Sequence, residues 1–305
     1  MADDVLFEKR PDGVALITLN RPDSLNAMGG QLMPMLADYL AQCVRDGDVR
    51  CVVLTGAGRA FCAGGDVKAM GQRPAGGAAT AGGDPSASSG QAPKAMGQRQ
   101  PAGEGGEGGD GAPRSIPSDL EERVEGLRQM QMRTSYVLHA MPKPTIAMVN
   151  GYAVGAGLSL CLATDIRIAS EQAKFGTAFR NVGLSGDFGG SHFLTRLVGI
   201  GKARELYFTA EITDAQEAYR IGMVNKVVPH DQLEAETMAF AAKLAAGPTA
   251  TYARMKQNLT LAEHADLKTL LDHEALTMTL SGMSNDSREA VRAFIEKREP
   301  KFQGS

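Results

Sequence analysis

The chain has 305 residues, with 32 lysines and arginines against 35 aspartates and glutamates, so its formal net charge at pH 7 is −3. This length is sufficient for one large domain with a full core, and the weak charge argues against a surface for nucleic acid or anionic membranes. The polar start MADDVLFEKR lacks the apolar segment of a signal peptide, and no apolar run approaches the roughly 20 residues of a membrane span, so we expect a cytoplasmic protein with no membrane partner.

The spacing of cysteines and histidines argues against a disulfide framework or a metal site. The cysteines contain no CxxC pair and lie among apolar residues, which is typical of reduced thiols in a core: Cys43, Cys51, Cys62 and Cys161. The histidines show no metal-ligand spacing either: His139, His192, His230, His264 and His273. We therefore expect no bound metal.

The first part of the chain alternates strand and helix patterns. Residues 5–10 and 13–20 are expected to pair as strands around the turn Pro11-Asp12-Gly13. Residues 31–45 carry apolar side chains at helical spacing, and the run RCVVLTG at 50–56 predicts a buried strand. Strand, helix and strand in this order indicate a parallel sheet, whose ligands bind beyond the carboxyl ends of the strands.

Small residues follow the strand predicted at 50–56. The segment RAFCAGGDVK, at residues 59–68, places Ala63-Gly64-Gly65 just before an expected helix start. Asp66 is well placed to cap that helix. Small residues at a strand-to-helix junction let a ligand approach the backbone closely, although they also serve tight packing alone.

A similar junction occurs in TIAMVNGYAVGAGLSLCLATD, residues 145–165. The apolar run 145–149 predicts a buried strand, Asn150-Gly151 a turn, and Gly155-Ala156-Gly157 the opening of a buried helix at 158–163. A helix start presents N–H groups without partners and the positive end of the helix dipole, which suits an oxygen that gains negative charge. Two such loops together can form an oxyanion hole.

Residues 71–113 differ in composition from the rest of the chain. Of these 43 residues, 13 are glycine and none is valine, isoleucine, leucine, phenylalanine, tyrosine or tryptophan. The hexapeptide KAMGQR occurs at 68–73 and again at 94–99, which indicates a tandem duplication. Such a segment cannot bury enough apolar area to offset the entropy lost on ordering, so we expect a flexible surface loop.

The remaining elements are predicted from periodicity and from glycine and proline positions. A helix is expected at 118–140, with an apolar face formed by Leu120, Val124, Leu127, Met130, Met132, Tyr136 and Val137. Further predictions are strands at 165–170, 174–176 and 226–228, a Gly-rich loop at 183–199 that enters a helix near 191, and a helix at 214–221 capped by Asp214. From 231 to 297 the pattern is helical, with interruptions near 247–248 and 282–286.

The segment AFCAGGD followed by KPTIAMVNGYAVGAGLSL resembles the crotonase superfamily, which includes enoyl-CoA hydratases and isomerases. The opening GVALITLNRPDSLNAM, the later ITDAQEAYRIGMVNKVVP and the closing SREAVRAFIEKREPKF are also similar to that family. The resemblance covers nearly the whole chain except one insertion. It implies an α/β fold whose crotonase-like ββα-repeat spiral core spans residues 1–230, interrupted by the flexible Gly/Ala/Pro-rich insertion at 71–113.

The resemblance also implies a C-terminal helical region, residues 231–305, that packs against neighbouring subunits in homotrimers or dimers of trimers. Helical periodicity alone would equally fit a bundle within one chain. The family carries a substrate-covering segment near residues 71–113. Residues 71–113 could therefore form a mobile lid over the acyl pocket, ordered only at its ends, instead of a flexible spacer.

For the chemistry, the resemblance implies that the backbone N–H groups of Gly65 and Ala156 hold the carbonyl oxygen of an acyl-CoA thioester. No permanently bound cofactor is implied, because coenzyme A arrives as part of the substrate. The family's contacts with coenzyme A fall on Ser24, Leu25, Ala63, Gly64, Asp66, Val67, Lys68 and Gly155. Lys68 would pair with a phosphate, although an exposed helix lysine needs no such role.

The acid–base residues differ from those of the hydratases that the chain resembles. Those enzymes use two glutamates, whose positions fall on Ser159 and Phe179 in this chain. Neither side chain can take up a proton usefully, so hydration by the two-glutamate route is not supported. A carboxylate remains nearby in Asp187. Dienoyl-CoA isomerases, isomerases of ring-epoxidised phenylacetyl-CoA and an aryl-CoA dehalogenase carry a catalytic aspartate at this loop position.

Asp187 is expected to carry a proton between two carbons of the acyl group. The pocket around it is expected to be lined by Ser159, Phe179, Leu184 and Phe188, and its apolar character raises the pKa of the carboxyl group. Alternatively, Asp187 caps backbone N–H groups of a Gly-rich turn, and Ser159 only packs. His139 is expected to be structural, and His192 to meet solvent rather than the acyl group.

The sequence therefore favours an enoyl-CoA isomerase that shifts a double bond through an enolate. The alternatives are a hydratase, or a ring-opening or hydrolytic enzyme, in which Asp187 positions water, and an acyl-CoA binder without catalysis. No GxGxxG follows a strand and no phosphate-binding P-loop is present, which argues against nicotinamide-dependent and nucleotide-hydrolysing functions.

Overall fold

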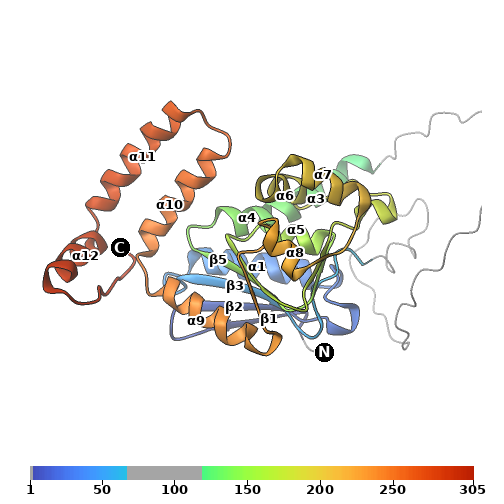
Figure 1. Cartoon of the computed structure of the whole chain (residues 1–305), viewed down its shortest axis with the longest axis horizontal. Helices are drawn as coiled ribbons and strands as arrows, with labels where there is room; N and C mark the ends of the chain where they lie inside the picture. The colour runs from blue at the N-terminus through green and yellow to red at the C-terminus, as the bar shows by residue number, and fades with distance from the viewer. Residues whose placement is uncertain (1–2, 67–118) are drawn as a thin grey trace, which may run out of the picture.

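The computed structural model describes residues 3–66 and 119–305. The loop predicted at 71–113, with its KAMGQR repeat, lies outside the described residues, as do Val67 and Lys68 of the expected coenzyme A contacts. The described chain forms two β-sheets with covering helices, from which three C-terminal helices project at one end (Figure 1).

A six-stranded sheet forms the centre of the molecule, in the order β1-β2-β3-β5-β7-β10. Its strands are β1 (Val5–Lys9), β2 (Val14–Leu19), β3 (Cys51–Gly56), β5 (Thr145–Val149), β7 (Ile166–Ser170) and β10 (Lys226–Val228). β1 pairs antiparallel with β2, and the later pairs are parallel. β3 and β5 are buried along their whole length, which explains why the sequence presents them as nearly uninterrupted apolar runs.

A second sheet is built from short strands in the order β4-β6-β8-β9. They are β4 (Ala60–Cys62), β6 (Tyr152–Val154), β8 (Lys174–Gly176) and β9 (Thr213–Asp214). β4, β6 and β8 each come shortly after a strand of the large sheet, which produces the strand–strand repeat expected for the core. β4 and β6 were not predicted, because three residues are too few to show a period of two.

Alternate residues of the central strands face two different hydrophobic cores. Val52 of β3 belongs to a core shared with α1 (Leu32–Arg45) and α5 (Ala156–Leu162). Val53 belongs to a second core, which α9 (Leu233–Ala245) covers. The large sheet is therefore buried on both faces, as a mostly parallel sheet requires. The predicted α/β fold class is confirmed.

Shorter helical elements connect the strands. They are α6 (Gly190–Val198), α7 (Ile200–Thr209), α8 (Ala215–Arg220) and the 3₁₀ turns Pro22–Ser24, Phe179–Val182 and His230–Gln232. Asp214 caps α8 as predicted, because its carboxylate accepts a hydrogen bond from the Glu217 N–H at 2.9 Å. The sequence analysis did not predict α7, of which only Ala203 and Leu206 are buried, so it lacks a clear apolar stripe.

The predicted helix at 118–140 is two helices, α3 (Leu120–Arg133) and α4 (Ser135–Ala140). Thr134 separates them with φ −122° and ψ −84°, and its hydroxyl donates to the Met130 carbonyl at 2.7 Å. The predicted apolar face is present on α3, but no residue of this helix is buried. Periodicity identified the helix and could not identify what its apolar face contacts.

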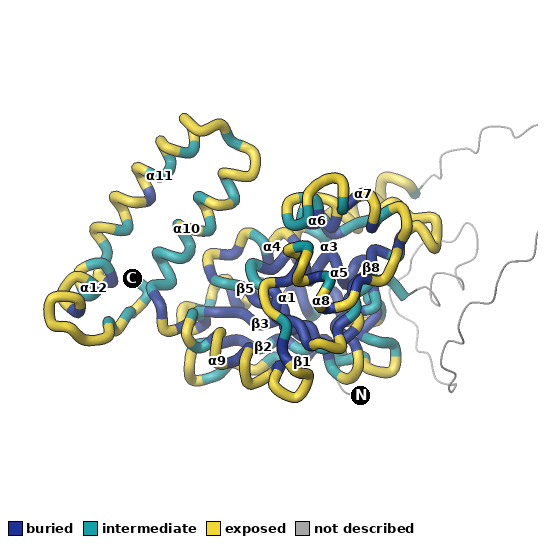
Figure 2. The backbone as a smooth tube through the Cα atoms, viewed as in Figure 1, coloured by how far each residue is buried: buried dark blue, intermediate teal, exposed yellow. Residues whose placement is uncertain are grey.

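The helices α10 (Thr249–Ala262), α11 (Leu267–Gly282) and α12 (Asn285–Glu296) project from the sheets (Figure 1). Figure 2 shows α11 and α12 mostly exposed and α10 mostly of intermediate burial. α9 precedes them in the predicted C-terminal region and packs on the large sheet. The break between α10 and α11 was not predicted; there the Asp266 carboxylate caps α11 by accepting from the Thr269 N–H at 3.0 Å. No helix within the described ranges is long and apolar enough to cross a membrane.

A largely buried ion pair attaches α10 to the central sheet. The Lys256 ammonium lies 2.8 Å from the Asp165 carboxylate, and 13% of the lysine side chain is exposed. Asp165 also accepts hydrogen bonds from the N–H and the hydroxyl of Thr145, at 2.8 and 2.9 Å. Loss of hydration lowers the pKa of Lys256, and the nearby carboxylate offsets part of this effect. These contacts fix the start of the projecting helices relative to β5.

Candidate active site

The small sheet brings the two predicted glycine-rich loops together. β4 and β6 are paired in parallel, so the loops that follow them emerge side by side. A Cβ added at Gly64 would lie 2.7 Å from the Val154 carbonyl oxygen and 3.3 Å from the Ala156 nitrogen. Its φ of +86° is also a conformation that glycine adopts readily. Glycine is therefore required at this position for the two loops to touch.

Each loop presents a backbone N–H that is available to a ligand. Ala156 is the first residue of α5, and Gly155 before it has φ +56° and no side chain to cap the helix. Among the described residues, no hydrogen bond has the N–H of Gly65 or of Ala156 as its donor. Two such donors in adjoining loops can stabilise a carbonyl oxygen that gains negative charge.

Asp187 lies in the loop between the 3₁₀ turn Phe179–Val182 and α6. Its Oδ1 atom is buried and has no hydrogen-bond partner in the part of the chain that the structure describes. This burial disfavours the charged form and raises the pKa of Asp187 from 3.8 to about 6. The Gly190 N–H bonds to the backbone carbonyl of Asp187, at 3.1 Å, rather than to its carboxylate. The turn-capping alternative for this side chain is therefore not supported.

Tyr207 of α7 is a neighbour of Asp187 that the sequence analysis missed. Burial, and then the charge of Asp187, raise the pKa of Tyr207 to about 12. Its ring stacks on that of Phe179, with centroids 6.1 Å apart and 12° between the planes. A Cβ added at Gly186 would lie 3.2 Å from the Tyr207 ring, so the loop passes directly over it. Finding Tyr207 required recognition of α7, for which the sequence contained little periodic signal.

The hydroxyl groups of Ser159 and Tyr207 converge at the start of α6. A Cβ added at Gly190 would overlap the Ser159 Oγ and lie 2.8 Å from the Tyr207 Oη. Ser159 is 1% exposed, and its hydroxyl donates to the Gly155 carbonyl at 3.4 Å, a long hydrogen bond. The site therefore combines the Asp187 carboxyl group with two neutral hydroxyls, which can bind water or a substrate oxygen.

Aromatic side chains connect the glycine-rich loops to the Asp187 loop. A Cβ added at Gly155 would lie 3.9 Å from the Gly64 Cα and 3.9 Å from the Phe179 ring. Phe179 and Phe188 are buried, whereas Leu184, which was also predicted to line the pocket, is 49% exposed. Phe188 has φ +50°, a backbone strain of the kind that persists at functional sites.

Three of the predicted coenzyme A contacts lie close together. The Ala63 N–H donates to the Leu25 carbonyl at 3.0 Å, which places the 3₁₀ turn containing Ser24 beside the first glycine-rich loop. Asp66 forms a 3.8 Å ion pair with Arg21. The helix that Asp66 was expected to cap lies outside the described residues.

The chain is similar to known proteins along nearly its whole length. The family model described as enoyl-CoA hydratase/isomerase matches residues 9–86 and 120–305. The chain is 36% identical to the 1,2-epoxyphenylacetyl-CoA isomerase of Escherichia coli, over 96% of this chain and 95% of that protein. It is 31% identical to the short-chain-enoyl-CoA hydratase of Clostridium acetobutylicum, over 97% and 96%.

Solved structures of enoyl-CoA hydratases are also similar to this chain. The crystal structure of an enoyl-CoA hydratase from Bacillus anthracis is similar with a TM-score of 0.80 and 29% identity, covering 99% of this chain and 100% of that one. An enoyl-CoA hydratase from Mycobacterium smegmatis is similar with a TM-score of 0.78 and 29% identity, covering 99% of each chain. With its paired glycine-rich loops and its match along nearly the whole length, the chain belongs to the enoyl-CoA hydratase/isomerase family of the crotonase superfamily.

Proposed function

We propose that the protein is an enoyl-CoA isomerase that shifts a double bond by proton transfer through an enolate. The observation that carries this proposal is the partly buried carboxyl group of Asp187, whose pKa is raised to about 6 in the same site as two available backbone N–H groups. The Escherichia coli relative, which is named 1,2-epoxyphenylacetyl-CoA isomerase, supports an isomerase as well.

In this mechanism the thioester carbonyl oxygen accepts hydrogen bonds from the N–H groups of Gly65 and Ala156. Loss of a proton from the α- or γ-carbon moves charge onto that oxygen, and each well-aimed donor lowers the barrier by about 3 kcal/mol. The Asp187 carboxylate takes the proton, and its acid form returns it to the other carbon. A pKa of about 6 keeps the carboxylate populated at neutral pH and makes it a stronger base than an exposed aspartate.

The second candidate is a hydratase, or a ring-opening or hydrolytic enzyme. Ser159 and Phe179 occupy the positions of the two hydratase glutamates, so Asp187 alone would have to orient and deprotonate the water. The hydroxyls of Ser159 and Tyr207 favour this candidate, because each can donate a hydrogen bond to a water or a substrate oxygen. The Clostridium acetobutylicum relative is named a hydratase.

Product analysis in D₂O with straight-chain, aromatic and steroid-like enoyl-CoAs separates these candidates. An isomerase incorporates deuterium at the α- or γ-carbon without adding water, and it forms or removes the absorbance of the conjugated thioester, depending on the direction of the shift. A hydratase removes that absorbance and adds the mass of one water. Binding of every acyl-CoA with no deuterium exchange would show a non-catalytic binder, and the proposed function would be wrong.

We expect Tyr207→Phe to move the acidic limb of the pH profile upward. The substitution keeps the ring stacked on Phe179 and removes the Tyr207 hydroxyl, which lies close enough to Asp187 for the two groups to interact electrostatically. In the more apolar pocket the pKa of Asp187 rises further, by up to about one unit, so kcat/KM falls mainly on the acidic side. The measurement is kcat/KM on both sides of pH 6, with Tyr219→Phe, an exposed tyrosine of α8, as the control. An unchanged profile would show that the Tyr207 hydroxyl does not influence Asp187.

A homotrimer or dimer of trimers is supported by apolar side chains on the projecting helices. Met278 of α11 is 75% exposed, and Phe294 and Ile295 of α12 are 85% and 73% exposed. Large exposed apolar surfaces are typical of sites that contact another protein. Light scattering should give a molar mass three or six times that of one chain, and the mass of a single chain would contradict this.

The four buried free cysteines favour a reducing compartment such as the cytoplasm.

A further inference from the structure

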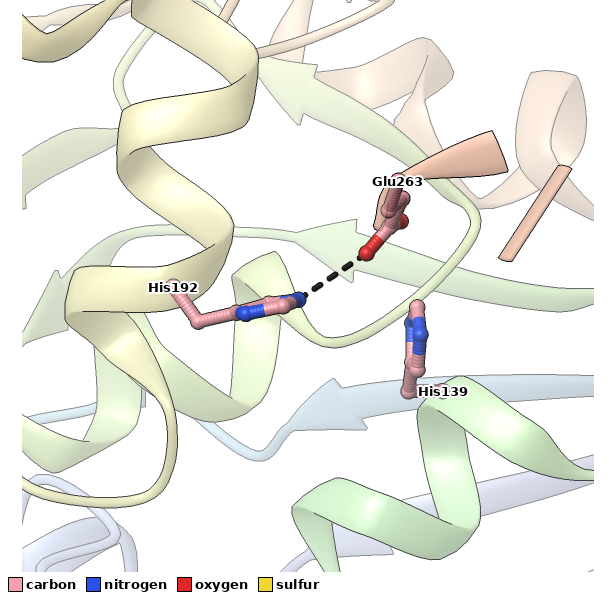
Figure 3. Close-up of side chains that lie close together, drawn as sticks. All are labelled: His139, His192 and Glu263. Atoms are coloured by element: carbon pink, nitrogen blue, oxygen red, sulfur yellow. Dashed lines mark hydrogen bonds and ion pairs between the residues drawn. The ribbon is translucent and has the colours of Figure 1, made fainter. Parts of the chain in front are cut away.

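We propose that His139, His192 and Glu263 bind one divalent transition-metal ion of the zinc type where α10 meets the core. The three residues come from α4, from α6 and from the residue that follows α10. Each offers one ligand atom, and these atoms all lie within 4.8 Å of one another (Figure 3). The site needs the tertiary structure, since these residues are too far apart in sequence to form a spacing motif.

The geometry needs only small side-chain movements to enclose an ion. Figure 3 shows the imidazole of His192 directed at the Glu263 carboxylate, with the Nε2 and Oε2 atoms 2.9 Å apart, and the ring of His139 beside them. The ligand atoms of a tetrahedral zinc site, with bonds of about 2.0–2.1 Å, lie roughly 3.3 Å apart. The His192–Glu263 pair would therefore open slightly, while His139 moves inward.

The ring of Phe193 packs against both imidazoles. Phe193 lies between them, with its centroid 5.2 Å from that of His139 and 5.2 Å from that of His192. Neutral imidazole is the form that binds a metal. Two imidazoles and one carboxylate suit zinc, cobalt or nickel better than calcium or magnesium, which prefer all-oxygen sites.

Arg196 competes with an ion for the Glu263 carboxylate. Its Nε atom lies 3.2 Å from Oε2 of Glu263, and 38% of the arginine side chain is exposed. Such a partly exposed ion pair is weak, so the arginine can turn into solvent when an ion binds. Removal of the arginine should therefore strengthen metal binding.

The ligand atoms are accessible, and binding would have a structural consequence. His139, Arg196 and Glu263 line a cavity of about 400 Å³ between α10 and the core, which provides an entry path and room for a water as the fourth ligand. An ion held by His192 and Glu263 would tie α6 to α10. Because α6 begins at Gly190, shortly after Asp187, the ion would also restrain one end of the active-site loop.

The test is titration of untagged, EDTA-treated full-length protein with Co²⁺, followed by the visible absorption of the bound ion. We expect one ion per chain, and Zn²⁺ should displace it and raise the unfolding temperature. His192→Ala and Glu263→Gln should each weaken binding at least about tenfold, because losing a direct ligand costs no less than losing a group that supports one. Arg196→Gln should tighten it.

Two controls distinguish this site from nonspecific binding. His264→Ala removes an exposed histidine next to Glu263 in sequence and should leave the affinity unchanged. His192 is 43% exposed, so its alanine variant is expected to fold, and an unfolding curve checks this. Binding that is equally strong in wild type and His192→Ala, binding weakened by His264→Ala alone, or the absence of any stoichiometric ion would each overturn the proposal.

Discussion

Replacing Asp187 with asparagine is expected to reduce deuterium exchange and isomerisation by ~10²–10⁴-fold. The amide keeps the size of the side chain but cannot accept the proton, while the N–H groups of Gly65 and Ala156 still hold the carbonyl oxygen. KM should therefore change little. The measurement is the exchange rate in D₂O, with the exposed Asp231→Asn as the control. Full activity of Asp187→Asn would show that another group carries the proton.

The same residue determines the expected pH dependence. A base must be ionised, so kcat/KM of the wild type should rise with pH through about 6, the pKa to which burial raises Asp187. An exposed carboxylate would give a limb nearer 3.8, its ordinary value. The residual activity of Asp187→Asn should lack this limb. If the pH profile of Asp187→Asn still rose through about pH 6, the titrating group would be a residue other than Asp187.

Asp187→Asn should also stabilise the fold, which separates a catalytic loss from misfolding. The pKa of the native carboxyl group is raised from 3.8 to about 6. Protonation of Asp187 therefore stabilises the folded state relative to the unfolded state. This contribution is fully present below pH 3.8, the ordinary pKa, and is lost as the pH rises through the folded pKa of about 6. Relative to wild type, the asparagine variant should gain about 1–3 kcal/mol above pH 6, after allowance for partial solvent exposure, and less at pH 4. Urea unfolding at both pH values measures this difference, and a pH-independent difference would contradict it.

Gly64→Ala is expected to lower kcat by ~10²–10³-fold, about the effect of losing one oxyanion donor. The new Cβ would lie 2.7 Å from the Val154 carbonyl oxygen and 3.3 Å from the Ala156 nitrogen, both of them backbone atoms. One loop must move away from the other, which separates the N–H groups of Gly65 and Ala156. Steady-state kinetics should show a fall in kcat larger than any rise in KM.

Gly199→Ala provides the matched control for this strain. Gly199 has φ +78°, close to the +86° of Gly64, but a Cβ there meets nothing within 4 Å. Both substitutions place a side chain at a positive φ, which alanine adopts at a cost, and only Gly64→Ala also pushes the two loops apart. Equal kcat values for the two variants, at comparable unfolding temperatures, would show that the glycine-rich loops do not hold the reacting oxygen.

Local sequence was sufficient for many elements. The strands predicted at 145–149, 174–176 and 226–228 have the bounds observed for β5, β8 and β10. Long apolar runs and nearby turn residues act over a few positions, so they are readable without knowledge of the fold. The break at Thr134 was not predicted; there the Thr134 hydroxyl donates to the Met130 carbonyl, and a side chain that enters the hydrogen-bond ladder can interrupt a helix.

The sequence by itself determined the longer strands and helices and the two glycine-rich loops, because apolar period and glycine conformation are local properties, and its motifs indicated the family by resemblance. Only the tertiary structure placed Tyr207 beside Asp187, and gathered His139 with His192 of α6 and with Glu263, which follows α10. Those contacts join segments distant in the chain. The pKa of a buried carboxyl group likewise depends on which atoms exclude water from it, and that is settled by packing.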